Sequence, residues 1–174
     1  PAHDGGIPSQ GGSTMLQLYA GIASHYLAGY PMSSESDMPS KFEEFIRQTG
    51  ASLGLMSDNA KSETSSRIQI LHCLYCIRDR QSEPHYQHQN PDERRIQDVK
   101  RMTKSIMFHV GCPAKYWLLC MLYVISLLNV MTNVHGAIPL TVVTCEVTDV
   151  SAFLTFHFWQ EVFYQNPDKS EKLG

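Results

Sequence analysis

Two acidic residues of this sequence, Asp58 and Glu93, lie at positions where a carboxylate could take part in catalysis or bind a metal ion. Asp58 follows residues 52–57, an apolar run that predicts a strand, and α/β folds tend to display reactive groups where a strand leaves the sheet. A structural role is the alternative, because Asp58 and Asn59 are also residue types that cap the N-terminus of a helix. Asp58 becomes informative only together with the second carboxylate, Glu93.

Glu93 opens a predicted helix over residues 92–110 whose polar face carries amines. With about 3.6 residues per turn, this polar face consists of Glu93, Gln97, Lys100 and Lys104, with Arg101 beside them. The opposite face, which we expect to be buried, consists of Ile96, Val99, Met102, Thr103, Ile106 and Val110. A carboxylate that leads into a row of amines is suited to binding phosphate groups. A solvated helix face has the same composition, so that interpretation stays open.

The elements that must position these residues alternate along the chain. A hairpin followed by alternating strands and helices indicates an α/β fold with a mixed central sheet and flanking helices. We expect, in order, strands over residues 14–21 and 25–32 as a β-hairpin, a helix ending near Gly50, a strand over 52–57, a helix carrying Ile68, Leu71 and Leu74, an extended piece over 77–82, helices over 92–110 and 114–131, and a strand over 156–165.

Length and charge limit the class of protein. A chain of 174 residues with 43% hydrophobic residues can bury one core, so we expect one domain. Its parts are a glycine-rich loop over residues 1–13, a core over 14–132 and a C-terminal extension over 133–174 that carries the last strand. The net charge of −3 argues against a surface that binds nucleic acid everywhere, so any such contact must be a local patch.

Cysteine usage predicts reduced thiols. The chain has five cysteines, an odd number, mostly within apolar stretches, which favours buried thiols and an intracellular protein. Cys73 and Cys76 have a metal-like spacing next to His72, but no second pair follows, so we expect buried structural thiols there. His85 and His88 precede Glu93 and are candidates for DNA or metal contact as well as ordinary loop residues.

A membrane span is not expected. The most apolar run, residues 116–130, is shorter than the roughly 20 residues that a bilayer crossing needs, which favours a buried core helix. The first residues are small and polar, where a secretory signal would need an apolar run.

Two acidic blocks and several later blocks together resemble the integrases of copia-type LTR retrotransposons, which belong to the retroviral integrase superfamily. Residues 57–63 (SDNAKSE) and 88–97 (HQNPDERRIQ) resemble the second and third blocks of its D,D-35-E signature, and Glu93 follows Asp58 by 35 positions. Asn90 and Glu93 are separated by one residue fewer than in many relatives. The later blocks, in the family's order, are residues 108–129, 138–141, 148–151 and 156–164.

This resemblance implies an RNase H-like fold and DNA integration, that is, metal-dependent processing of 3′ ends and strand transfer of retroelement DNA into target DNA. Asp58 and Glu93 would be catalytic ligands of two Mg²⁺ or Mn²⁺ ions, which clamp the attacking and leaving oxygens of a phosphoryl transfer. The family works on DNA as a homo-oligomer, in the nucleus or in a cytoplasmic virus-like particle. The residues implied in DNA contact are Asn59, Gln97, Lys100, Arg101 and Lys104.

This sequence differs from the family's signature at its first aspartate. In the family that aspartate lies on a strand just before the hairpin, whereas Asp4, the one candidate in residues 1–13, is followed by Gly5 and Gly6, which are typical of a turn. We therefore expect this strand to lie before Pro1, so that the chain is a truncated core. Whether it is an enzyme stays open, and the alternative is an inactive remnant that retains only nucleic-acid binding or self-association. A different RNase H-like nuclease is a third hypothesis, against which the later blocks argue.

Overall fold

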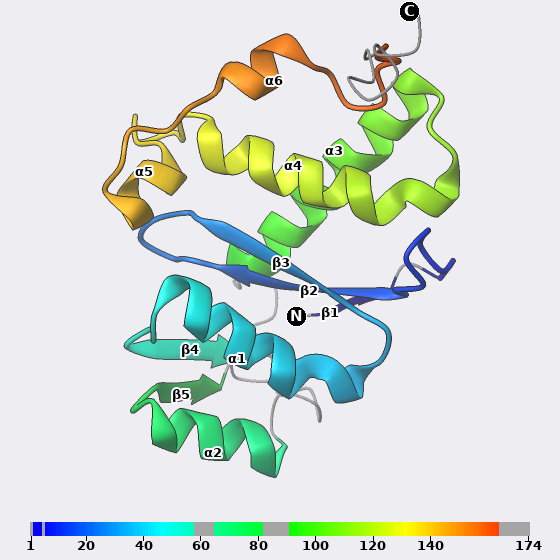
Figure 1. Cartoon of the computed structure of the whole chain (residues 1–174). Helices are drawn as coiled ribbons and strands as arrows, with labels where there is room; N and C mark the ends of the chain where they lie inside the picture. Colours follow the sequence, from blue (N-terminus) through cyan, green and yellow to red (C-terminus); the bar gives the residue numbers. More distant parts are fainter. Residues whose placement is uncertain (1, 5, 58–64, 82–90, 164–174) are drawn as a thin grey trace, which may run out of the picture.

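The chain folds into layers of helices on either side of two small sheets (Figure 1). The computed structural model describes residues 2–4, 6–57, 65–81 and 91–163. The predicted α/β class is confirmed, with both antiparallel and parallel strand pairs. In Figure 1, helices α3 (Pro91–Val110) and α4 (Trp117–Val130) lie above the hairpin, and helices α1 (Met38–Thr49) and α2 (Ser66–Leu74) lie below it.

Strands β2 (Met15–Ala20) and β3 (Leu27–Met32) form the predicted antiparallel hairpin. Side chains of a strand point alternately to its two faces. Leu16 and Leu18 of β2 accordingly join the core formed with α3 and α4, whereas Tyr19 stacks on Phe45 of α1 with ring centroids 4.3 Å apart. The hairpin therefore packs on one face against an upper core, formed with α3 and α4, and on the other against a lower core, formed with α1 and α2.

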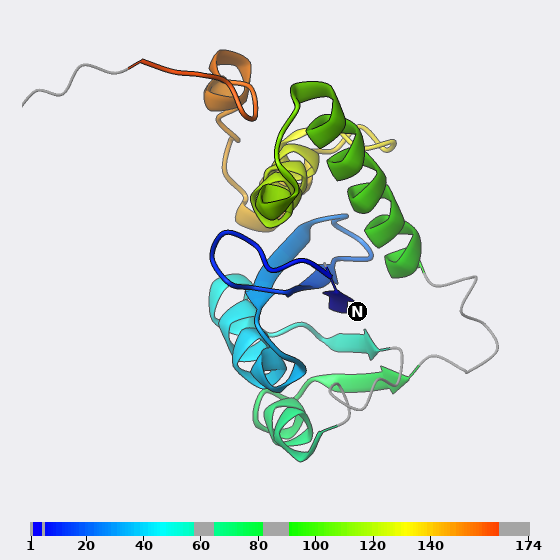
Figure 2. The same ribbon diagram turned by 90° about the vertical axis from the view of Figure 1, so that its right-hand side faces the viewer.

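A third strand, β1 (Ala2–Asp4), pairs antiparallel with β2 and places Asp4 opposite Met15. The prediction that residues 1–13 are loop throughout is wrong for these residues. A strand of three residues is too short to show an alternating pattern. Its extended conformation therefore depends on pairing with β2 and cannot be read from composition. Figures 1 and 2 both show β1 between β2 and the second sheet.

The second sheet consists of β4 (Gly54–Ser57) and β5 (Arg78–Gln81), which run parallel with Gly54 opposite Arg78. It confirms the predicted strands over residues 52–57 and 77–82, each with shorter bounds. Parallel strands need a crossover connection, and α2 lies within it. Ile68 and Leu71 of α2 are buried in the lower core, but Leu74, which we expected on the same face, is 67% exposed.

The cysteines depart from the prediction of buried thiols. All five are free, yet only Cys120 is buried, while Cys73, Cys76 and Cys145 are exposed. Helix α2 turns its buried residues, Ile68, Leu71 and His72, toward α1, so Cys73 falls on the outer face. The apolar neighbours of Cys73 in sequence therefore indicated burial that the helix geometry does not provide.

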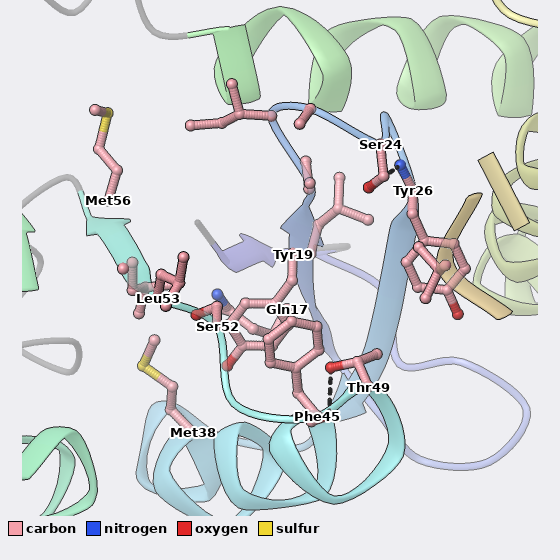
Figure 3. Close-up of a pocket in the computed structure, with 18 residues that line it drawn as sticks. Gln17, Tyr19, Ser24, Tyr26, Met38, Phe45, Thr49, Ser52, Leu53 and Met56 are labelled. Atoms are coloured by element: carbon pink, nitrogen blue, oxygen red, sulfur yellow. Dashed lines mark hydrogen bonds between the residues drawn. The ribbon is translucent and has the colours of Figure 1, made fainter. Parts of the chain in front are cut away.

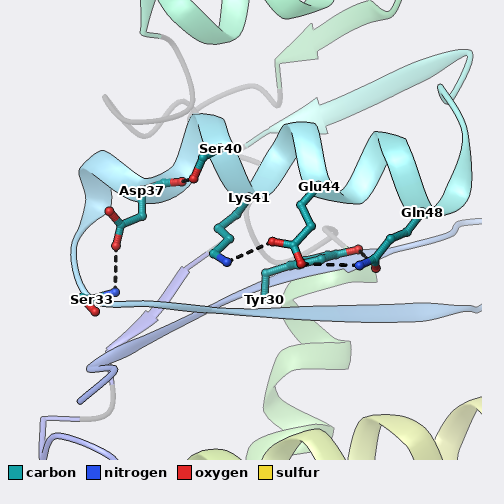
Figure 4. Close-up of polar contacts among 7 residues, drawn as sticks. All are labelled: Tyr30, Ser33, Asp37, Ser40, Lys41, Glu44 and Gln48. Carbon is teal, nitrogen blue, oxygen red and sulfur yellow. Dashed lines mark hydrogen bonds and ion pairs between the residues drawn. The ribbon is translucent and has the colours of Figure 1, made fainter. Parts of the chain in front are cut away.

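The start of α1 is fixed by polar contacts around Asp37 (Figure 4). The Asp37 carboxylate accepts hydrogen bonds from the backbone N–H groups of Ser33 and Ser34, at 2.9 and 3.1 Å. These bonds hold the pKa of Asp37 below its usual value. Further along the helix, the Tyr30 hydroxyl donates to Gln48 at 2.8 Å, so α1 is tied to the hairpin by a hydrogen bond as well as by aromatic packing.

Helices α3 and α4 form the upper core with β2. Ile96 and Val99 of α3 and Val124 of α4 are buried against Leu16 and Leu18. The predicted helices over residues 92–110 and 114–131 are confirmed, the latter as a 3-10 turn, η3 (Ala114–Tyr116), that continues into α4. No helix in the described part of the chain is both long and apolar enough to cross a membrane.

Beyond α4 the structure holds two short helices, α5 (Pro139–Thr144) and α6 (Ser151–Thr155), for which the sequence predicted no helix. The predicted final strand is wrong for residues 156–163, which form turns and irregular backbone. Trp159 has φ of 65°, a left-handed conformation that interrupts any extended run. Phe163 is 98% exposed, so the alternation of apolar residues in this segment does not reflect burial on one face of a sheet.

Candidate active site

Helix α3 carries the one predicted carboxylate whose side chain the structure describes. Pro91 stands at the first position of the helix, where its missing N–H costs nothing. Glu93 lies in the first turn and is exposed. Glu93 forms no salt bridge with another described residue.

The predicted phosphate-binding face of α3 is largely confirmed as accessible. Gln97, Arg101 and Lys104 are exposed, and Lys100 is half-buried. Arg101 is engaged within the helix, because its guanidinium donates to Asp98 at 2.9 Å. Its charge is thereby partly balanced, which makes the two lysines the stronger candidates for phosphate.

The opposite face of α3 is buried as predicted only along its first half. Ile96 and Val99 are 8% and 1% exposed, and Ile106 packs against the upper core, but Val110 is 39% exposed. The prediction for Val110 is wrong because α3 ends there, at a point where Gly111 turns the chain away with φ of 65°.

Asp4 lies on a strand, contrary to the prediction that residues 1–13 form a loop. It is the last residue of β1, the strand that directly precedes the hairpin and pairs with β2. β1 thus lies next to β2, the strand whose Leu16 and Leu18 share a buried core with Ile96 and Val99 of α3.

Asp58 and Asn59 lie outside the described residues, as do His85 and His88. The described chain does fix where the segment carrying Asp58 leaves the sheet, because Ser57 is the last residue of β4. In Figure 2 the carboxyl end of β4 and the first turn of α3 face the same side of the molecule. The strand that leads to Asp58 and the helix that begins near Glu93 therefore converge on one side.

A pocket of about 500 Å³ lies elsewhere, between β2, α1 and β4 (Figure 3). Its lining is mainly apolar and includes Tyr19, Phe45 and Leu55. Two polar atoms, Oε1 of Gln17 and Oγ of Ser52, are buried there without a hydrogen-bond partner in the described chain. None of the predicted site residues lines this pocket, so it is not the place for the chemistry of Glu93.

Comparison with solved structures identifies the fold. No family model matches the sequence, and no curated protein matches it. The catalytic core domain of HTLV-2 integrase in complex with magnesium, in its trimeric form, matches with a TM-score of 0.59 and 19% identity over 74% of this chain and 84% of that chain. The dimeric form of the same domain matches with a TM-score of 0.59 and 17% identity, over 75% of this chain and 83% of that chain.

The chain has the fold of a retroviral integrase catalytic core. The cryo-EM structure of a simian T-cell lymphotropic virus intasome in complex with PP2A regulatory subunit B56 gamma extends the match. Its TM-score is 0.63 at 13% identity, over 92% of this chain and 55% of that chain. The expected RNase H-like class is thereby confirmed.

Within this integrase-core fold, the donor set suits a hard divalent cation. Carboxylate oxygens are the protein ligands that Mg²⁺ prefers, and the candidates are Asp4, Asp58 and Glu93. Among residues 6–57, 65–81 and 91–163, no three His, Cys, Asp or Glu side chains gather closely enough to hold a metal. Glu93 is the candidate in those ranges, and its exposed carboxylate without a salt bridge fits the role of a ligand.

The strand position of Asp4 is the feature that sequence reasoning missed. The glycines after Asp4 are typical of a turn, and the turn indeed follows, with Gly6 at φ of 67°. The signal that could have located the strand is the length of the connection. Ten residues separate Asp4 from Met15, enough for the chain to turn and pair beside the hairpin.

Proposed function

We propose that this chain is the catalytic core of an integrase of the copia type that joins DNA ends to target DNA. The observation that carries the proposal is helix α3, which presents the exposed Glu93 and a row of amines on an integrase-core fold. The order of the sequence blocks supports the copia assignment, since they follow the order of that family.

Asp4, Asp58 and Glu93 are the proposed metal ligands. The strand position of Asp4 supports its place as the first aspartate, and the match to a core domain in complex with magnesium supports the choice of Mg²⁺ or Mn²⁺. Two such ions, when bound, stabilise the charge that develops on the attacking and leaving oxygens of a phosphodiester.

Positively charged and amide side chains are proposed to bind the DNA. Lys100 and Lys104 of α3 bind phosphates of the DNA backbone and hold the reacting ester near Glu93, because ammonium groups neutralise phosphate charge. Gln97, Arg101 and Asn59 provide further hydrogen-bond donors to the same DNA. The matched domains are described as dimeric and trimeric and as part of an intasome, which supports a homo-oligomer that works on DNA in the nucleus or in a virus-like particle.

The test is a joining assay with two short DNA duplexes and Mg²⁺. The chain should join them, and Asp4→Asn, Asp58→Asn and Glu93→Gln should each abolish joining, because each keeps the side-chain size but removes a charge that holds the cation. Glu43→Gln on α1 is the matched control and should leave joining unchanged.

Circular dichroism and DNA affinity separate the outcomes. Lost joining with an unchanged fold points to the metal ligands. A chain that binds DNA but joins none, with or without these substitutions, would be the inactive remnant and would refute the catalytic proposal.

A further inference from the structure

Three basic side chains from distant parts of the sequence meet on the flank of α3. Arg95 Nη2 lies 2.9 Å from Nδ1 of His25, which belongs to the turn between β2 and β3. The ring of His25 stacks on that of His135, from the connection between α4 and α5, with centroids 5.4 Å apart and planes at 25°. The cluster joins the hairpin turn, the first turns of α3 and the far end of α4.

The contact with Arg95 fixes the protonation of His25. A guanidinium is always charged and only donates, so Nδ1 of His25 must accept and its proton must lie on Nε2. Desolvation and the nearby Arg95 and His135 lower the pKa of His25, which keeps the ring neutral. Those two side chains, from α3 and from the α4–α5 connection, are the charged or titratable groups that act on His25.

No negative charge balances this cluster within the described chain. Arg95 is half-buried, yet no described carboxylate lies within 4.0 Å of it, and the contact with His25 is its one hydrogen bond among the described residues. A partly buried guanidinium is stabilised when an anion binds beside it. The remaining N–H groups of the guanidinium form the planar fork that binds two oxygens of a phosphate.

The hairpin turn holds His25 in place for this contact. The backbone N–H of His25 donates to Gly21, and that of Gly21 donates to Tyr26, both at 2.8 Å. His25 has φ of 58°, in the left-handed region, which costs free energy that the surrounding structure must supply. The backbone is thus held in an uncommon conformation at the point where the imidazole meets Arg95.

We propose that His25, Arg95 and His135 form a binding site for a phosphate group of the DNA backbone. The site rests on the proposed function for its DNA, and it is distinct from the row of lysines, because Arg95 lies on the side of α3 that faces the hairpin. DNA that reaches this flank of α3 is thereby bound at a phosphate other than those at the lysines. In the phosphate-bound site Arg95 donates to the phosphate instead of to Nδ1 of His25, which is then free to take up a proton. Bound phosphate favours protonated histidine, so binding tightens as the pH falls.

The experiment uses the full chain with inorganic phosphate in one arm and a short DNA duplex in the other. ¹⁵N NMR follows the Arg95 Nε–H and the histidine rings during titration with phosphate at pH 7.5 and 5.5. Fluorescence anisotropy follows DNA binding at several salt concentrations. The variants are Arg95→Gln, His135→Gln and His25→Asn, since Asn tolerates the left-handed conformation, and Arg47→Gln on α1 is the control for loss of one charge.

Phosphate should shift the Arg95 and histidine signals, more strongly at pH 5.5. Arg95→Gln should reduce the slope of log affinity against log salt for DNA by about 0.9, with an unchanged amide spectrum, whereas Arg47→Gln should leave the slope unchanged. The tightening of DNA binding between pH 7.5 and 5.5 should diminish in His25→Asn and His135→Gln.

The other outcomes overturn the inference in different ways. If Arg95→Gln binds DNA as Arg47→Gln does while Lys104→Ala binds more weakly, the cluster is no DNA contact although the proposed function stands. If phosphate shifts the Arg95 signal but the chain binds no DNA, the site takes free phosphate, and DNA as its source is refuted together with the proposed function.

Discussion

The side chain of Asn129 on α4 forms two hydrogen bonds with the backbone of Leu27 on β3, although 102 positions separate them. Its Oδ1 accepts from the Leu27 N–H at 2.8 Å, and its Nδ2 donates to the Leu27 carbonyl at 2.7 Å. Asn129 and Leu27 are both buried. The amide therefore acts as a strand partner for the first residue of β3 and fixes the position of α4 on the hairpin.

Replacing Asn129 by Ala should destabilise the fold strongly. It leaves a buried N–H and a buried C=O without partners, and each such group costs about 1–3 kcal/mol, so the free energy of unfolding should fall by about 2–6 kcal/mol. Urea unfolding gives this value, and the amide exchange rate of Leu27 should rise in parallel. Ser126→Ala, at an exposed position of the same helix, should change stability by less than about 0.5 kcal/mol. A loss for Asn129→Ala no larger than that of the control would contradict the role.

The five thiols should differ in their reaction with iodoacetamide in the folded protein. Cys73, Cys76 and Cys145 are exposed and should be alkylated first. Burial raises the pKa of Cys120 to about 11, which leaves almost no reactive thiolate at pH 8. Peptide mass spectrometry should therefore find Cys120 modified only after unfolding. Early labelling of Cys120 would show that the core between α3 and α4 opens readily.

Asp37 should make the stability of the fold depend on pH in the acidic range. Hydrogen bonds from the backbone of Ser33 and Ser34 lower its pKa from an ordinary value of 3.8. A carboxyl with a lowered folded-state pKa stabilises the fold above the unfolded value, and this contribution is lost as the pH falls through the folded one. The stability difference between the natural chain and Asp37→Asn should thus be constant above about pH 5 and shrink below pH 3.8. Thermal unfolding between pH 2 and 7 measures it, and a difference that does not vary with pH would contradict it.

Lys104→Ala should weaken DNA binding without affecting the fold, because this lysine is exposed. Loss of one phosphate contact should lower the slope of log affinity against log salt by about 0.9. Lys41→Ala on α1 removes an equal charge that pairs with Glu44 at 2.9 Å and should leave the slope unchanged. Equal slopes for the two variants would remove Lys104 from the interface.

Sequence patterns predicted the elements whose residues repeat regularly over a long enough stretch. Helix α3 shows its buried face in Ile96 and Val99, and the hairpin shows as two runs of mainly aliphatic and aromatic residues, six residues in each strand. The pattern fails where the secondary structure of a segment depends on a partner elsewhere in the sequence. Asp4 is an example, because its strand is formed by pairing with β2. The pattern also fails near Trp159, where apolar residues alternate but no described strand lies alongside.

The candidate site was predictable in part for the same reason. The exposure of Glu93 and Lys104 follows from helical periodicity, whereas the contact of His25 with Arg95 leaves no trace in sequence. It depends on how the hairpin turn approaches α3, and neither residue has a spacing that predicts it. The exposure of Glu93 and Lys104 is observed, but the roles of the predicted site residues in chemistry or DNA binding stay predictions: Asp58, Asn59, Glu93, Gln97, Lys100, Arg101 and Lys104.

The short pairing of β1 has a consequence for assembly. Among the described strands, β1 pairs with β2 only from Met15 to Gln17, whereas β3 pairs with β2 along its whole length. The outer edge of a strand can take up a strand of another molecule, and a charged side chain there opposes such pairing. A lysine in place of Ala20, at the end of β2, should therefore oppose association of concentrated chains through intermolecular β-structure.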